Sequence, residues 1–291
     1  MLGAQQKPVD LRRSRAAFLG PPKVGKSELH SRRSGIVYLN LDDGLNHLDV
    51  YSTELVTTWE GVQEAYKEIR EDIHQGNKLE AVVIDTIDRL YEIACDEVAR
   101  RLKVPDISRL NDYGASYHEA QMLVMKVLDG FHGDLGLGVY LLGHTRTVEK
   151  DTPQGIKVTI QESNLSSQMQ RKLVGWLQFI FQLDLIPAEL ISLEKTRDKK
   201  KVGQFADVEH VLYTGVSPHL LCGGRFYTEP PAYIPLPRAP EGWDRVLAKL
   251  QPLLEPKKTA SKPVQEKPEV PQPAEAEPPE EAPVEDLVDG K

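Results

Sequence analysis

The chain has 291 residues, 40% of them hydrophobic and 27% charged, which is ordinary for a soluble globular protein with one full-sized core. The formal net charge is -8, but residues 255–291 carry ten acidic and five basic side chains, so the remainder carries only -3 and a local basic groove is not excluded. The two cysteines, Cys95 and Cys222, form no CxxC pair, which argues against zinc and disulfide scaffolds. No signal-peptide pattern and no apolar run of about 20 residues occurs, so we expect a cytoplasmic protein without a membrane span.

The first predicted element is a short apolar strand at residues 16–19, which runs into a glycine-rich loop. The loop is a full match to the P-loop pattern G-x-x-x-x-G-K-[ST]: Gly20, Pro21, Pro22, Lys23, Val24, Gly25, Lys26 and Ser27. The two glycines let the backbone aim N–H groups at phosphate oxygens. Lys26 would reach the β and γ phosphates, and Ser27 would ligate magnesium. A helix over 28–34 should follow with its positive end near the anion, so the pattern predicts a site for ATP and Mg²⁺.

A second strand is predicted at residues 36–41, and it ends in Asp42, Asp43 and Gly44. Water that attacks a phosphoryl group needs a base or an orienting group, and a carboxylate at this strand end would serve. We prefer Asp43 to Asp42 as this catalytic residue. The alternative is an ordinary Asp-Gly turn.

Apolar residues at helical spacing between Val62 and Ile73 predict a helix before the third strand. The third strand, at residues 81–85, reads AVVID and ends in Asp85. A carboxylate at a strand end beside a P-loop can hold magnesium through water, as in a Walker B motif. We therefore predict that Asp85 and Ser27 share the metal. The alternative is an aspartate that caps the next helix.

Two further helical stripes, within 87–98 and 117–131, precede a fourth strand at residues 137–143. This strand ends in His144, where a side chain would contact the γ-phosphate and report its presence to the following loop. We predict His144 as a sensor, with a structural or surface histidine as the alternative. All four strands are nearly continuous apolar runs, which predicts an α/β fold with a mainly parallel twisted sheet flanked by helices.

The rest of the chain changes in character. Residues 150–170 are polar without a clear period and predict a long loop, followed by strands at 179–185 and 190–194 and a basic run, LEKTRDKKK. The predicted division is an N-terminal arm (1–13), an ATPase domain (14–237), a short C-terminal helix (238–254) and a disordered Pro/Glu-rich acidic tail (255–291).

With these motifs in order, the sequence resembles the phage RecA-like nucleotide-binding ATPases, the family that includes the Sak-type single-strand annealing proteins. The resemblance runs from about Arg15 to Pro237 and depends on GPPKVGKS, LDDGL, VVIDTIDRL, YGASYHEA and LLGHT. It implies a RecA-like P-loop core that hydrolyses ATP, assembles side by side into a ring or filament, and anneals single-stranded DNA in phage recombination. A single-stranded-DNA-binding protein is often a partner. Asp43 stands where related proteins often have glutamate, which implies slow turnover.

The resemblance also assigns basic residues. Lys195 and Arg197 match two cations that RecA-like proteins place one position apart on a late strand, where they reach the neighbouring subunit's nucleotide. The alternative is a solvated basic hairpin. Residues 145–168 correspond to a DNA-contacting loop, in which Arg146, Lys150 and Lys157 would meet phosphates although no aromatic side chain is present for base stacking.

Two other classes of function stay open. One is a different P-loop enzyme, such as a helicase loader or a small-molecule kinase, although the sequence shows no clear arginine-rich lid or acceptor pocket. The other is an ATP-gated DNA-binding scaffold whose hydrolysis is incidental.

Overall fold

The computed structural model describes residues 8–151, 155–187, 190–195, 201–205, 208–217, 219–236 and 242–255. By internal contacts the chain divides into two units, residues 1–256 and 257–291. The predicted disordered tail therefore lies outside the described residues, and the account below concerns the first unit.

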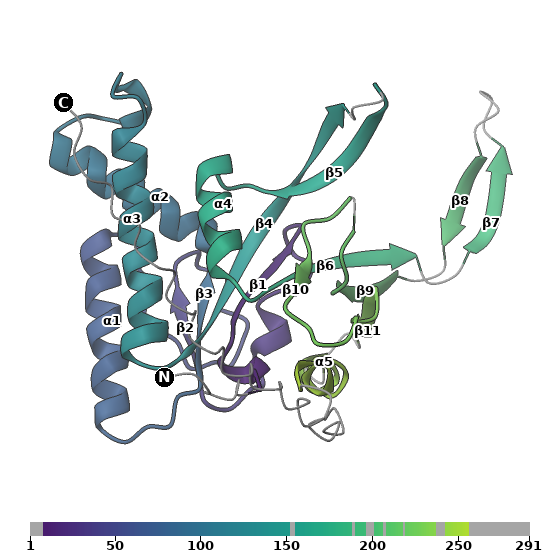
Figure 1. Ribbon diagram of the computed structural model, residues 1–291, viewed down its shortest axis with the longest axis horizontal. Coiled ribbons are helices and arrows are strands. Elements are labelled where there is room, and N and C mark those ends of the chain that lie inside the picture. Colours follow the sequence, from purple (N-terminus) through teal and green to yellow (C-terminus); the bar gives the residue numbers. More distant parts are fainter. Residues whose placement is uncertain are drawn as a thin grey trace, which may run out of the picture. The chain divides into compact units, whose positions relative to one another are not determined.

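A mixed sheet forms the centre of this unit (Figure 1). Its path is β11-β9-β6-β1-β4-β3-β2, with β5 paired to β4 and β10 paired to β6. The strands β2, β3, β4, β1 and β6 are mutually parallel, and the others join antiparallel. The bounds are β1 Arg15–Gly20, β2 Ile36–Asn40, β3 Ala81–Asp85, β4 Gly138–Asp151, β5 Lys157–Ser163, β6 Phe179–Pro187, β9 Val208–Tyr213, β10 Gly223–Gly224 and β11 Tyr233–Leu236. A separate two-stranded sheet pairs β7 (Leu190–Lys195) with β8 (Lys201–Phe205).

The α-helices are α1 Trp59–His74, α2 Ile87–Leu102, α3 Ala115–Asp129, α4 Ser167–Trp176 and α5 Gly242–Leu250. Single turns are η1 Leu11–Arg13, η2 Glu28–His30, η3 Ile107–Arg109, η4 Gly130–Asp134 and η5 Gln251–Leu254. Two helices begin at threonine caps that accept a backbone N–H: Thr58 from Gly61 for α1, and Thr86 from Arg89 for α2. Thr86 directly follows β3, so one residue ends the strand and starts the helix.

Alternating side chains along the strands build one hydrophobic core on each face of the sheet. On β1, Ala17 and Leu19 join the core that contains the inward faces of α1, α2 and α3, which stand together in Figure 1. Ala16 and Phe18 join the opposite core, which contains buried side chains of α5. Strands covered on both faces explain the continuous apolar runs in the sequence. The predicted α/β class, with a mainly parallel sheet flanked by helices, is confirmed.

Two predictions about elements are wrong. Residues 150–170 do not form a long loop, because β4 continues to Asp151, β5 returns antiparallel to it and α4 follows. The sequence does not indicate these two polar strands, because their hairpin is largely exposed and lacks an apolar period. The helix expected over 28–34 is only the three-residue turn η2, and Gly35, with φ of 74°, turns the chain into β2. A turn this short supplies little helix dipole for an anion.

Candidate nucleotide site

The P-loop joins the C-terminal end of β1 to η2, between the ends of β4 and β6. A Cβ on Gly20 would lie 2.5 Å from the carbonyl oxygen of Leu183 on β6, so only glycine lets the loop leave the sheet here. Gly25 has φ of 88°, in the left-handed region that favours glycine. Val24 anchors the loop in the core, whereas Pro22 and Lys23 are exposed. The P-loop is thus anchored to the core through Val24, while Pro22 and Lys23 face solvent.

Lys26 is buried under this loop, with an exposed fraction of 6%. Its Nζ donates to the carbonyl oxygens of Gly20 at 3.1 Å and Pro21 at 2.8 Å. Burial lowers the pKa of Lys26 to about 8, and the negative charges of Asp85, Asp88 and Asp42 oppose this shift. A partly desolvated ammonium bonded only to carbonyl oxygens would gain a stronger partner from a phosphate anion.

Ser27 and Asp85 bring the two predicted Walker motifs into contact. The Ser27 hydroxyl donates to Oδ2 of Asp85 at 2.6 Å. Burial raises the pKa of Asp85, and the Ser27 hydrogen bond acts in the opposite direction. Asp85 ends β3 opposite Asn40 of β2, whose Oδ1 is buried with no hydrogen-bond partner among the described residues. These oxygens converge at the carboxyl end of the sheet, beside Lys26.

This donor set fits magnesium bound together with a nucleotide. In the described part of the chain no group of three or more His, Cys, Asp or Glu side chains is arranged to hold a metal. Mg²⁺ commonly keeps several waters and binds through one or two carboxylates plus substrate phosphates. One buried carboxylate, one hydroxyl and the unpaired Asn40 oxygen suit that mode better than a closed protein cage.

The structure distinguishes between the two aspartates that end β2. Asp43 lies in a turn with φ of 45°, and its carboxylate and carbonyl accept from Asn46. Asp42 is the residue whose charge acts on both Lys26 and Asp85. It also lines a cavity of about 270 Å³ together with His144. The geometry therefore favours Asp42, although we preferred Asp43 from sequence.

His144 lies within β4, opposite Gly20 in the register with β1, at the point where β4 leaves β1 and begins to pair with β5. Its side chain is 24% exposed and its charge acts on Asp85. Its backbone N–H donates to Oδ2 of Asp88 at 2.7 Å. The structure therefore places the predicted sensor next to the Walker B carboxylate.

Two further residues of the site were not found from sequence. Tyr38 of β2 donates its hydroxyl to the carbonyl oxygen of Ser27 at 2.8 Å and so supports the P-loop from behind. His210 of β9 lies with Cδ2 4.0 Å from where a Cβ on Gly25 would be, and its Nδ1 is buried without a partner among the described residues. Tyr38 looks like any core residue of an apolar run, and His210 is far from every motif, so no sequence signal was available.

The three basic residues predicted to contact DNA lie together on one hairpin. Arg146, Lys150 and Lys157 lie on the β4–β5 hairpin, which projects from the sheet in Figure 1. Lys150 is paired with Glu162, and Lys157 Nζ lies 3.9 Å from Glu149. Of the other predicted pair, Lys195 ends β7 and its side chain lies outside the described residues, as does the whole of Arg197.

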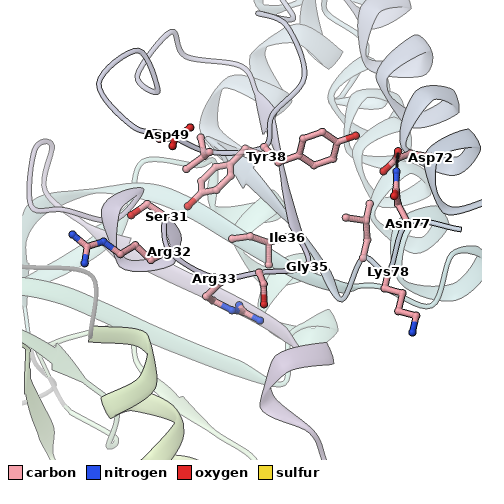
Figure 2. A pocket seen from close by; sticks show the side chains of 14 residues that line it. Ser31, Arg32, Arg33, Gly35, Ile36, Tyr38, Asp49, Asp72, Asn77 and Lys78 are labelled. Carbon is pink, nitrogen blue, oxygen red and sulfur yellow. Dashed lines mark hydrogen bonds between the residues drawn. The ribbon is translucent and has the colours of Figure 1, made fainter. Parts of the chain in front are cut away.

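A second pocket, of about 550 Å³, lies beside β2 and contains no P-loop residue (Figure 2). Ser31, Arg32 and Arg33 line one end of it, and Asp72 and Asn77 line the other. Arg33 stacks on the rings of Tyr140 and Trp243 at 4.8 and 4.3 Å, which ties it to the core that α5 covers. This pocket shares Tyr38 with the nucleotide site but none of the P-loop residues.

A family model described as an AAA domain matches residues 12–226 of this chain. The match includes the P-loop, Asp85, His144 and the β4–β5 hairpin. The chain belongs to this family. This AAA domain is a P-loop NTPase, and the family implies that Lys26, Ser27 and Asp85 line a nucleotide site.

Comparison with solved structures gives a more distant likeness. The flagellar accessory protein FlaH from Methanocaldococcus jannaschii is similar with a TM-score of 0.30 and 10% identity, over 69% of this chain and 76% of that one. We draw no inference from a likeness at this level. The comparison with curated proteins finds no match to this chain. Among the described residues, none of its helices combines the length and the apolar character that crossing a bilayer requires.

Proposed function

We propose that this AAA domain binds ATP with Mg²⁺, hydrolyses it slowly, and uses the cycle to promote annealing of single-stranded DNA in phage-type recombination. The observation that carries the ATPase part is the 2.6 Å hydrogen bond between Ser27 and Asp85, beside the buried ammonium of Lys26. Lys26 and Ser27 of the P-loop and Asp85, which follows Ser27 by 58 positions, form one site whose chemistry suits a metal-bound triphosphate. The resemblance of the motifs to the Sak-type proteins supports the DNA part.

Each residue has a defined task in this proposal. The loop backbone and Lys26 bind the phosphates, while Ser27 and Asp85 hold the metal, which when bound neutralises charge on the transferring phosphoryl group. Asp42 orients the attacking water, because its charge acts at this site while Asp43 is engaged by Asn46. His144 contacts the γ-phosphate from its position within β4, opposite Gly20 of β1.

The β4–β5 hairpin is the proposed DNA contact. Because it continues directly from His144, a change at the nucleotide has a short covalent path to it. Its lysines face acidic side chains, but exposed ion pairs contribute only about 0–1 kcal/mol, so a phosphate can replace the carboxylate. We further propose that subunits assemble side by side, with Lys195 and Arg197 reaching the neighbouring nucleotide, in the cytoplasm and alongside a single-stranded-DNA-binding protein.

The test compares ATP hydrolysis with and without single-stranded DNA and records particle size in parallel. We expect stimulation together with assembly in the wild type, and loss of both ATP binding and hydrolysis in Lys26→Ala. Lys67→Ala is the control, because Lys67 is an exposed lysine of α1 outside the P-loop. A wild type that takes up no ATP would overturn the proposal as a whole.

One observation favours a second candidate, a P-loop ATPase that acts on a protein, such as a helicase loader. The strand residues of the hairpin beyond His144 carry as many acidic side chains (Glu149, Asp151, Glu162) as basic ones, which is weak for a phosphate-binding surface. ATP hydrolysis that no nucleic acid stimulates would favour this candidate. Annealing that persists unchanged in Lys26→Ala would favour instead a DNA-binding scaffold with incidental hydrolysis.

A further inference from the structure

Asp88 is a carboxylate beside the nucleotide site to which none of the roles above gives a task. It lies in the first turn of α2, three residues after Asp85. Its Oδ2 accepts the backbone N–H of His144 at 2.7 Å and also lies 3.4 Å from Nδ1 of the His144 ring. One oxygen therefore contacts both the main chain and the side chain of the same residue.

Asp88 makes this contact in a poorly solvated position. Its side chain is 15% exposed, and its other oxygen, Oδ1, is buried without a hydrogen-bond partner among the described residues. A half-satisfied carboxylate costs stability, so a merely structural role is a poor explanation for it. As an acidic residue in the first turn of α2 it gains only about 0.3–1 kcal/mol from the helix dipole, which an exposed carboxylate would gain equally.

Gly143, which precedes His144, lies where β4 comes close to α2. A Cβ on Gly143 would lie 2.9 Å from Cδ2 of Leu19 and 3.7 Å from Oδ2 of Asp88. The same Cβ would lie 3.1 Å from Cγ2 of Ile87, the first residue of α2, so β4 passes close to the first turn of α2 at Gly143.

His144 is also held from its other side. Its carbonyl oxygen accepts the N–H of Asn164 at 3.0 Å, where β5 leads into α4. Asp88, His144 and Asn164 all line the cavity of about 270 Å³ that also includes Asp42. His144 is thus fixed between α2, which follows Asp85, and the segment that links β5 to α4.

We propose that Asp88 is a positioning residue that holds His144 in the orientation in which it meets the γ-phosphate. The inference rests on the proposed ATPase role of His144. The charge of Asp88 also acts on Lys26, which concerns phosphate binding. The positioning effect passes through two contacts to one histidine, so the loss of kcat on removal of Asp88 should depend on the presence of that histidine.

A double-mutant cycle on steady-state ATP hydrolysis tests this dependence. Asp88→Ala should lower kcat roughly tenfold and change KM less than about twofold, as for loss of a group that orients an active-site side chain. The double variant Asp88→Ala, His144→Ala should match His144→Ala alone. Glu92→Ala is the control, because Glu92 lines the same cavity one turn further along α2 and pairs with Arg89. The proposal would be wrong if the fold-loss of kcat in the double variant equalled the product of the losses in the two single variants. It would also be wrong if Glu92→Ala lowered kcat as much as Asp88→Ala.

A second readout does not depend on turnover. In the nucleotide-free protein labelled with ¹⁵N-histidine, the signals of His144, assigned by their loss in His144→Ala, should show one ring tautomer in the wild type and a mixture in Asp88→Ala. Asp88→Asn, which keeps an acceptor for the backbone N–H, serves if Asp88→Ala does not fold. If the His144 ring keeps the wild-type tautomer in these variants, the proposed contact is wrong, whatever the ATPase activity. If the tautomer changes but the wild-type protein hydrolyses no ATP, the contact is supported and the proposed function is wrong.

Discussion

At the scale of single residues, the decisive event is the meeting of a hydroxyl and a carboxylate that are 58 positions apart in the chain. Sequence predicts that Ser27 and Asp85 share a metal, and the structure brings Oγ and Oδ2 to 2.6 Å. It also shows what the motif cannot, namely that Lys26 is buried and that Tyr38 supports Ser27 from behind. The P-loop is thus a packed part of the core as well as a binding loop.

The Ser27 contact leads to a prediction about magnesium. Ser27→Ala removes a metal ligand and leaves Asp85 buried without its hydrogen-bond donor. We expect ATP affinity to lose its dependence on Mg²⁺, and the unfolding free energy to fall by about 1–3 kcal/mol. Titration of ATP with and without Mg²⁺, together with urea denaturation, measures both. Ser31→Ala is the control, since its exposed hydroxyl bonds only within its own turn. Retention of the magnesium effect would contradict the assignment.

At the scale of elements, the segment that closes the unit is the amphipathic helix α5. Its Trp243 is 2% exposed and packs against the rings of Phe18, His30 and Tyr140. The same indole stacks on the guanidinium of Arg33. The short C-terminal helix predicted within residues 238–254 therefore packs on one face of the sheet, against side chains of β1 and β4.

Removal of this indole should be costly. Trp243→Ala is expected to lower the unfolding free energy by about 3–5 kcal/mol, as for other large core truncations. Lys249→Ala, an exposed change on the same helix, should stay within about 0.5 kcal/mol. Chemical denaturation of both variants gives the comparison. Equal stability of the two proteins would show that α5 does not belong to the core.

The hairpin β4–β5 supports a prediction about DNA. Arg146 is exposed and, unlike Lys150 and Lys157, has no acidic partner among the described ion pairs. We expect Arg146→Gln to weaken binding of a single-stranded oligonucleotide and to reduce the slope of log affinity against log salt by about 0.7. Lys157→Gln should have a smaller effect. Fluorescence anisotropy at several salt concentrations measures these slopes, and Arg171→Gln on α4 controls for loss of charge elsewhere. An unchanged slope in Arg146→Gln would remove the hairpin from the proposed DNA contact.

At the scale of the whole molecule, contacts between the two ends of the first unit close its fold. The Gln251 side chain accepts the N–H of Leu11 at 2.9 Å and donates to the carbonyl of Val9 at 3.0 Å. Leu254 is fully buried in the core that also contains Leu11. The residues that precede β1 and those that follow α5 therefore stabilise each other.

Two truncations test where the folded unit ends. Removal of residues 257–291 should leave ATP affinity and the unfolding free energy unchanged, because the first unit extends to residue 256. Removal of residues 251–291 also deletes Gln251, Leu254 and the Leu253 carbonyl that accepts the N–H of Tyr227. It should cost roughly 3–5 kcal/mol from one buried leucine and three hydrogen bonds. Thermal unfolding and ATP titration of both proteins provide the readout. A large loss in the shorter truncation would show that the acidic tail is part of the fold.

The sequence by itself determined the α/β class, the parallel strands and the P-loop, because these depend on local patterns: apolar runs of strand length and glycines at defined spacing. It did not predict β5 and α4, which lie in a largely polar stretch without a clear period, nor that the segment after the P-loop is the single turn η2. Only the tertiary structure distinguished Asp42 from Asp43 by their contacts, and brought Asp88, Tyr38 and His210 close to the P-loop residues and His144. Such placements depend on which strand ends become neighbours in the sheet, and that follows from packing of the whole chain rather than from any short segment.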